Sequence, residues 1–135
     1  MKQNRSIPAP EVIPVLVCAD VRGAADWLVE VLGFVERVHI PPNHRIQLAG
    51  AGGGALVVAE RGVAGPQNLI LRVDDVDAVF ARAVAAGATA VTEPRDYEYG
   101  ERQAAIDDPS GHRWVLSQTL FDAEPESWGG ITVAH

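Results

Sequence analysis

The chain repeats one pattern of elements at an interval of about 55 residues. In the first half, a strand-like apolar segment ends at Asp20, and the helical pattern that follows stops at Gly33. In the second half, the corresponding strand-like segment ends at Asp75, and the helical pattern that follows stops at Gly87. Aspartate caps a helix N-terminus and glycine readily ends one. The caps lie 55 residues apart and the glycines 54, which indicates an internal repeat.

Each half supplies one strand, one helix and three further strands. Apolar residues recur at helical spacing near residues 21–32 and 75–86, which predicts two helices. Proline and glycine clusters separate the apolar and alternating segments that are typical of strands. The predicted strands lie at residues 12–20, 34–40, 44–49, 55–60, 68–75, 89–93, 102–107 and 112–117.

One helix covers only one face of a four-stranded sheet, so the other face of each unit is left for a partner or a ligand. We therefore predict an α+β fold in which two βαβββ repeat units form curved mixed sheets around a shared cleft. The units span about residues 11–60 and 67–118, and residues 119–135 form a C-terminal tail. The whole chain, residues 1–135, is expected to be a single domain.

The charge of the chain limits its partners. It has 18 acidic and 11 basic residues, a net charge of −7, and no basic stripe, so nucleic acid is an unfavourable partner. The single cysteine, Cys18, excludes an intrachain disulfide and a cysteine zinc cluster. No apolar run reaches the roughly 20 residues of a membrane helix, and the N-terminus lacks an apolar signal core. We expect a soluble, cytoplasmic protein without membrane partners.

Several segments resemble a known superfamily. VLVCADVRGAADWLVEVLGF in the first unit, and LRVDDVDAVFARAVAAGA, YGERQAAIDDPSGHRWVLSQ and ESWGG in the second, are similar to the vicinal oxygen chelate superfamily. This group contains glyoxalases, extradiol dioxygenases, fosfomycin-modifying enzymes and bleomycin-resistance proteins. The second-unit segments are similar to a glyoxalase-like branch that often lacks an assigned activity. The resemblance covers about residues 11–130.

The resemblance also locates the metal positions of the superfamily. Its metal enzymes hold one divalent ion through histidine, glutamine and glutamate side chains on the first and last strands of each unit. Carried over, these positions fall near Ile13, Val57, Asn68 and Val115. Three are aliphatic and the fourth offers one amide oxygen, whereas zinc normally needs three or four ligands. We predict no metal and no other cofactor.

The segment 112–117 is expected to line the cleft. Because side chains alternate along a strand, Trp114 and Leu116 are predicted to face the helix and the core. Arg113, Val115 and Ser117 then face the cleft.

Residues on the repeat-related strand and on one loop complete the predicted pocket. The tyrosines of the loop at 95–102 offer flat faces to a planar ligand, although this loop can equally be a solvated hairpin. Arg72 and Arg113 can clamp an anion or a carbonyl group, or pair with nearby aspartates. The predicted pocket residues are Ile13, Val57, Asn68, Ile70, Arg72, Tyr97, Tyr99, Arg113, Val115 and Ser117.

Other polar residues are assigned first to structure. Asp107 and Asp108 precede a Pro-x-Gly turn, which they can serve by hydrogen bonding, and an acid–base pair is the alternative. His112 is either a residue at a strand start or an acid or base of the pocket. The glycine run at 49–55 precedes a strand-like segment, so it predicts a hairpin turn and not a dinucleotide site.

Two main functional hypotheses follow. The first is a small-molecule-binding protein of the glyoxalase/bleomycin resistance type, without the usual metal site, whose ligand is cationic or aromatic. The alternative is a lyase, isomerase or dioxygenase of the same superfamily with an atypical or absent metal centre. In either case we expect a homodimer, with Trp128 or the tail before it near the interface.

Overall fold

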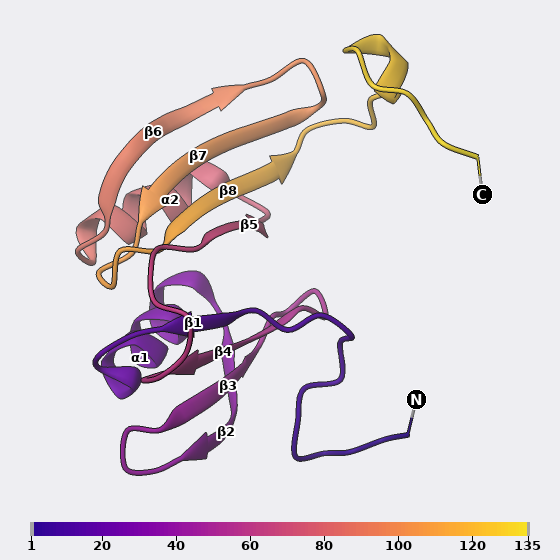
Figure 1. Ribbon diagram of the computed structural model, residues 1–135. Helices are drawn as coiled ribbons and strands as arrows, with labels where there is room; N and C mark the ends of the chain where they lie inside the picture. The colour runs from indigo at the N-terminus through magenta and orange to yellow at the C-terminus, as the bar shows by residue number, and fades with distance from the viewer. Residues whose placement is uncertain (1, 135) are drawn as a thin grey trace. The chain divides into compact units, whose positions relative to one another are not determined.

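The computed structural model describes residues 2–134 and divides into two compact units, with the boundary between Gln67 and Asn68. Each unit contains one long helix and one four-stranded mixed sheet (Figure 1). This confirms the predicted α+β class and the two βαβββ units. The cleft that the two sheets are expected to share stays a prediction.

The first unit carries its strands in the order β1-β4-β3-β2. Strand β1 is parallel to β4, and the remaining neighbours are antiparallel. The glycine run between β3 and β4 forms the predicted hairpin turn, where the Gly50 N–H donates to the Gly54 carbonyl at 2.7 Å. The elements are β1 (Val15–Val17), α1 (Val21–Leu32), β2 (Val35–Ile40), β3 (Arg45–Ala49) and β4 (Ala55–Ala59).

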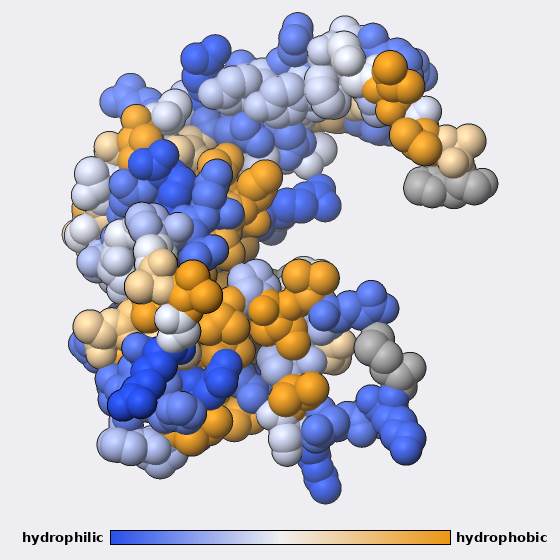
Figure 2. All heavy atoms as spheres, viewed as in Figure 1, coloured by the Kyte–Doolittle hydropathy of each residue, from blue (hydrophilic) through white to orange (hydrophobic). Residues whose placement is uncertain are grey.

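The second unit repeats this topology. Its strand order is β5-β8-β7-β6, again with one parallel pair, β5 and β8. A short 3-10 helix follows in the tail, which also carries the exposed apolar residues Phe121, Ile131 and Val133. Figure 2 shows hydrophobic atoms near the end of the tail. The elements are β5 (Asn68–Arg72), α2 (Val76–Ala85), β6 (Thr89–Asp96), β7 (Glu101–Asp107), β8 (Arg113–Thr119) and η1 (Pro125–Ser127).

Both helices begin at the predicted aspartates. The Asp20 side chain accepts a hydrogen bond from the Gly23 N–H at 2.9 Å, and Asp75 accepts one from Ala78 at 3.1 Å. Each bond satisfies a backbone donor that has no partner within its helix. Gly33 ends α1 with φ 82°, a left-handed conformation that glycine adopts without steric cost.

Each helix covers one face of its own sheet, and the core lies on that face. Helix α1 packs against β2, β3 and β4, and α2 against β6, β7 and β8. Strand residues on the covered faces alternate with residues on the other face. Those buried on the covered faces are Leu16, Ile46, Leu48, Leu56, Val58, Ala104, Ile106, Trp114 and Leu116.

Three strands differ by three residues or more from their predictions: β1, β5, which ends at Arg72 where residues 68–75 were expected, and β6. Proline is involved in β1 and β6. Strand β1 is limited to Val15–Val17, whereas residues 12–20 were expected, because Pro14 has no N–H to donate to a ladder. Strand β6 runs past the expected residues 89–93 and through Pro94. It tolerates a proline because it lies at the edge of its sheet.

Candidate functional site

The face of the second sheet that lies opposite α2 carries most of the predicted pocket residues. In the register of β5 and β8, Asn68 lies beside Arg113, Ile70 beside Val115 and Arg72 beside Ser117. Trp114 is 1% exposed and Leu116 0%, so these two fill the core, as the alternation predicts. The other face, which we call the open face of the second sheet, therefore carries the three pairs Asn68 and Arg113, Ile70 and Val115, and Arg72 and Ser117.

A chain of hydrogen bonds crosses this open face. The Tyr99 hydroxyl donates to Gln103 Oε1 at 2.8 Å, and Gln103 Nε2 donates to Ser117 Oγ at 2.9 Å. Ser117 Oγ in turn donates to Glu101 Oε1 at 2.8 Å. Every bond has ordinary hydrogen-bond geometry, so the chain fixes four side chains between the β6–β7 turn and the centre of the sheet. Sequence reasoning missed Gln103 and noted Glu101 only as part of the polar segment 95–102, although both alternate with core residues of β7.

Two opposite charges lie beside this chain. Arg72 Nη2 donates to Thr119 Oγ1 at 3.0 Å, and within residues 2–134 it has no carboxylate partner. Glu101 accepts from Ser117, and no ion pair joins it to a cation in the same range. Among residues 2–134, neither charge is therefore neutralised by an ion pair.

Arg113 differs from Arg72 because it is already paired. Its Nε lies 2.5 Å from Asp107 Oδ1, and its Nη2 lies 3.2 Å from Oδ2. The hydrogen bond from this guanidinium lowers the pKa of the Asp107 carboxyl below its ordinary value. Of the two predicted clamp residues, Arg72 is thus the one without an ion-pair partner among residues 2–134.

Three aromatic rings gather at the end of the open face. The Tyr97 and Tyr99 rings stack with centroids 5.2 Å apart, and Trp128 meets Tyr99 edge-on at 5.5 Å. The Arg95 guanidinium carbon lies 4.7 Å from the centroid of the Tyr97 ring. Burial raises the pKa of the Tyr99 hydroxyl, so this group stays a neutral donor at physiological pH. We call Tyr97, Tyr99 and Trp128 the aromatic cluster.

A glycine in the β6–β7 turn allows the tail to reach this cluster. The Gly100 N–H donates to the Tyr97 carbonyl at 3.2 Å, and Gly100 has φ 84°. A Cβ at this position would lie 2.4 Å from the Phe121 carbonyl oxygen, so only glycine permits the close approach. The segment is therefore part of the β6–β7 hairpin, and Trp128 of the tail contacts its Tyr99 ring.

The DPSGH segment forms a hydrogen-bonded turn before β8. Asp108 Oδ1 accepts from the Ser110 N–H at 2.9 Å and the His112 N–H at 3.0 Å, while Oδ2 accepts from Trp114 Nε1 at 2.9 Å. Asp108 and His112 are both buried. These bonds close the turn and hold the tryptophan ring, as expected for an aspartate that serves a turn.

In the first unit, the open face is the one opposite α1, and Val57 lies on it in register with Val15 and Gln47. Val57 and Gln47 are 4% and 6% exposed. Ile13 is half-buried and lies just before β1. Gln47 was not predicted, although a glutamine between two core residues of β3 is the signal for a polar group on this face.

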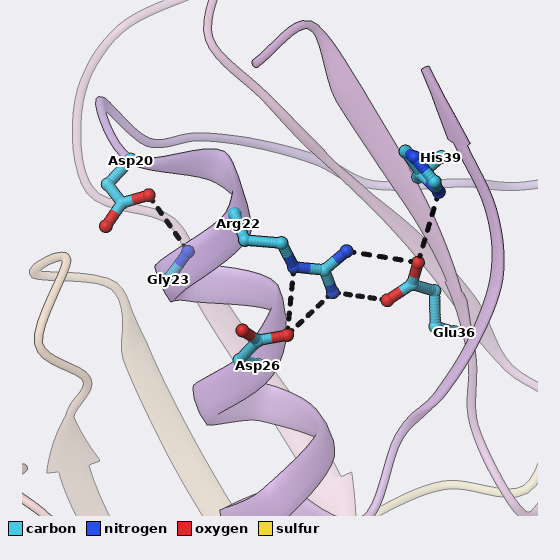
Figure 3. Close-up of polar contacts among 6 residues, drawn as sticks. All are labelled: Asp20, Arg22, Gly23, Asp26, Glu36 and His39. Carbon is cyan, nitrogen blue, oxygen red and sulfur yellow. Dashed lines mark hydrogen bonds and ion pairs between the residues drawn. The ribbon is translucent and has the colours of Figure 1, made fainter. Parts of the chain in front are cut away.

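A polar cluster on the other side of the first sheet joins α1 to β2 (Figure 3). Arg22 contacts Asp26 at 2.7 Å and also pairs with Glu36, and His39 Nδ1 lies 3.6 Å from Glu36 Oε2. The hydrogen bond from Arg22 lowers the pKa of Glu36. The Arg22 and His39 side chains are exposed, so the cluster fastens a helix to a strand at the surface.

The residues at the four predicted metal positions do not fit a divalent ion. Ile13, Val57 and Val115 have no lone pair, and Asn68 lies in register beside the guanidinium-bearing Arg113. Across residues 2–134, no three histidine, cysteine, aspartate or glutamate side chains form a group that could hold a metal. No helix in that range is long and apolar enough to cross a membrane.

Comparisons with known proteins agree with this topology. An uncharacterized protein of Mycobacterium tuberculosis is 33% identical over an alignment of 129 residues, and the match covers 82% of this chain and 75% of the relative. The crystal structure of TioX from Micromonospora sp. ML1 matches with a TM-score of 0.68 and 29% identity, covering 85% of this chain and 100% of that one.

A second solved structure is TnmS3, an antibiotic binding protein from Streptomyces sp. CB03234. It matches with a TM-score of 0.67 and 30% identity, covering 82% of this chain and 98% of that one. The family model described as Glyoxalase/Bleomycin resistance protein/Dioxygenase superfamily matches residues 12–116. The chain belongs to the glyoxalase/bleomycin resistance protein/dioxygenase superfamily.

Proposed function

We propose that this protein binds a small, partly aromatic molecule on the open face of the second sheet and releases it unchanged. The observation that carries the proposal is the hydrogen-bond chain from Tyr99 to Glu101. It places ordered polar groups beside the apolar Ile70, which is 70% exposed, and the half-buried Val115. An apolar surface with a few fixed polar anchors is the usual composition of a ligand site.

The charges beside the chain indicate which ligand fits. Arg72 lies in register with Ser117, and Glu101 bonds to the same serine, so an unpaired cation and an unpaired carboxylate flank one hydroxyl. A ligand with a carbonyl or anionic oxygen suits Arg72, and one with a cationic or donor nitrogen suits Glu101. The net charge of −7 favours a cationic molecule in the long-range field.

The aromatic cluster suits a planar ligand. Tyrosine and tryptophan rings bind flat apolar groups through offset or edge-to-face contacts. The Arg95 guanidinium lies over the Tyr97 ring, and this cation–π contact supports a cationic group in the ligand. The similarity to TnmS3, described as an antibiotic binding protein, supports an antibiotic or a related metabolite as the ligand.

The same proposal excludes a resident metal and metal-dependent catalysis. Aliphatic side chains stand at three of the four positions that the superfamily uses for ligands. We expect elemental analysis of the purified protein to find no stoichiometric zinc, nickel, iron or manganese. About one tightly held metal per chain would contradict this part of the proposal.

A thermal-shift screen against planar cationic and planar neutral antibiotics tests the function. Gln103→Leu breaks the hydrogen-bond chain and is expected to weaken binding of a stabilising compound about tenfold, equivalent to about 1.4 kcal/mol. Arg102→Ala is the matched control, because Arg102 is the next residue on β7 and pairs with Asp77 and Asp96.

Mass spectrometry of the compound recovered after incubation separates binding from catalysis. An unchanged mass supports the binding proposal, whereas a changed mass supports the lyase, isomerase or dioxygenase alternative. An equal loss of binding in Gln103→Leu and Arg102→Ala would place the site elsewhere.

A further inference from the structure

The N-terminal segment forms a turn whose carbonyl groups meet side chains of the first sheet. Asn4 begins the turn: its side-chain oxygen accepts from the Ser6 N–H at 3.0 Å, and its carbonyl accepts from the Ile7 N–H at 3.3 Å. Asparagine commonly closes a turn in this way.

Two donors from neighbouring strands hold the turn. Arg37 Nη2 on β2 donates to the Arg5 carbonyl at 2.6 Å, and Gln47 Nε2 on β3 donates to the Ser6 carbonyl at 2.7 Å. Arg37 also donates to Gln47 Oε1, which fixes the amide with its NH2 group toward the turn. Pro8, which follows the turn, is buried.

The bonds that hold the turn are to the main chain and not to its side chains. The Arg5 and Ser6 side chains are exposed, and only their carbonyl groups bond to the sheet. Gln47 is 6% exposed, and a buried amide is tolerated only when its hydrogen bonds are made. Arg37 and Gln47 therefore donate to two successive backbone carbonyls, groups that a peptide of any amino-acid sequence presents.

We propose that the open face of the first sheet is a binding site for a peptide-type ligand that presents two successive amide carbonyls in a turn. Residues 4–8 of the same chain occupy this site in the free protein. The site lies in the first unit, so the proposal does not depend on the ligand site proposed for the second sheet.

A substitution in the segment frees the site while the strands stay intact. Pro8→Asp replaces a buried ring with a charge whose burial is unfavourable, so the segment is expected to leave the sheet. Ala9→Asp is the matched control, because Ala9 is exposed. Trypsin is expected to cleave after Arg5 at least about tenfold faster in Pro8→Asp than in Ala9→Asp, because cleavage follows the open population.

A labelled peptide with the sequence of residues 2–10, KQNRSIPAP, then probes the site in trans. In the wild-type chain the tethered segment competes at a millimolar effective concentration, so fluorescence anisotropy is expected to show much weaker peptide binding than in Pro8→Asp. Adding Arg37→Ala to Pro8→Asp removes one carbonyl donor and is expected to abolish binding. Adding His39→Ala to Pro8→Asp is the matched control. His39 also lies on β2, but it is in register with the core residue Ile46 on the face covered by α1, so peptide binding is expected to be preserved.

Two results would overturn the proposal. The first is equal peptide binding by Pro8→Asp with and without Arg37→Ala. The second is an Arg37→Ala single variant that trypsin cleaves after Arg5 no faster than it cleaves the wild type. Neither readout uses an antibiotic, so a failure here leaves the second-sheet proposal unaffected, and the reverse also holds.

Discussion

Trp114 sets the orientation of β8. Its ring is 1% exposed, and its indole N–H donates to Asp108, which also closes the preceding turn. Because strand side chains alternate, a buried ring at this position directs Arg113 and Val115 to the open face. One residue therefore determines which face of the strand is available to a ligand.

We expect Trp114→Ala to lower the free energy of unfolding by about 3–5 kcal/mol, because the truncation leaves a core cavity. It also removes the donor to Asp108 Oδ2. Urea unfolding of this variant beside Val115→Ala measures the difference, and the half-buried valine is expected to cost much less. If Val115→Ala is the more destabilising variant, β8 faces the other way.

The cluster around Glu36 predicts a pH dependence of stability. Arg22 lowers the pKa of this carboxyl in the folded state below the ordinary 4.5, so folding favours the ionised form. The stabilisation is fully present above pH 4.5 and is lost as the pH falls through the lowered folded pKa. The Arg22 and Glu36 side chains are 46% and 32% exposed, so solvent screens the pair and its contribution is at most about 1 kcal/mol.

Unfolding of the wild type and of Glu36→Gln between pH 7 and pH 3 tests this dependence. We expect the stability difference between the two proteins to be largest near neutral pH and to shrink in acid. A difference that grows as the pH falls would contradict the assigned ion pair.

At the scale of elements, the helix starts depend on single side chains. Asp20 accepts from the Gly23 N–H, and Asn43 Oδ1 accepts from the Val21 N–H at 2.9 Å. Asp20→Ala is expected to lower the free energy of unfolding by about 0.5–2 kcal/mol, the usual cost of a lost N-cap. Glu30→Ala, on the exposed face of α1, is the control. Equal effects in denaturant unfolding would show that the cap is not needed.

Periodicity predicted the helices closely and the strand ends less well. The expected helices at 21–32 and 75–86 correspond to α1 (Val21–Leu32) and α2 (Val76–Ala85), because the capping aspartates mark where each helix starts. The long segment 12–20 contains only three strand residues, because strand pairing depends on a partner that the local pattern does not show.

The sequence predicted which residues of β8 lie on the open face, but not the hydrogen bonds that the side chains of the candidate site make. Alternation along β8 correctly separated Trp114 from Val115. The roles of Gln47 and Gln103 could not be read from local sequence, because their partners are distant. Gln47 bonds to Ser6, 41 residues away, and Gln103 to Ser117, 14 residues away.

For the whole molecule, we predict a homodimer. Each sheet has two edge strands, β1 and β2 in one and β5 and β6 in the other, and an edge strand can pair with a strand of another chain. The tail adds the exposed Ile131 and Val133. Light scattering at micromolar concentration is expected to give twice the 14.4 kDa mass of the chain. A clean monomer mass would contradict the prediction.

The central claim is that the open face of the second sheet binds the ligand. Calorimetric titration of the most stabilising antibiotic into the wild type and into Val115→Trp tests it most directly. An open-face side chain can grow without displacing the core, so we expect the variant to keep its melting temperature and lose binding. The wild type is expected to bind one molecule per chain. Equal binding by both proteins would contradict the claim.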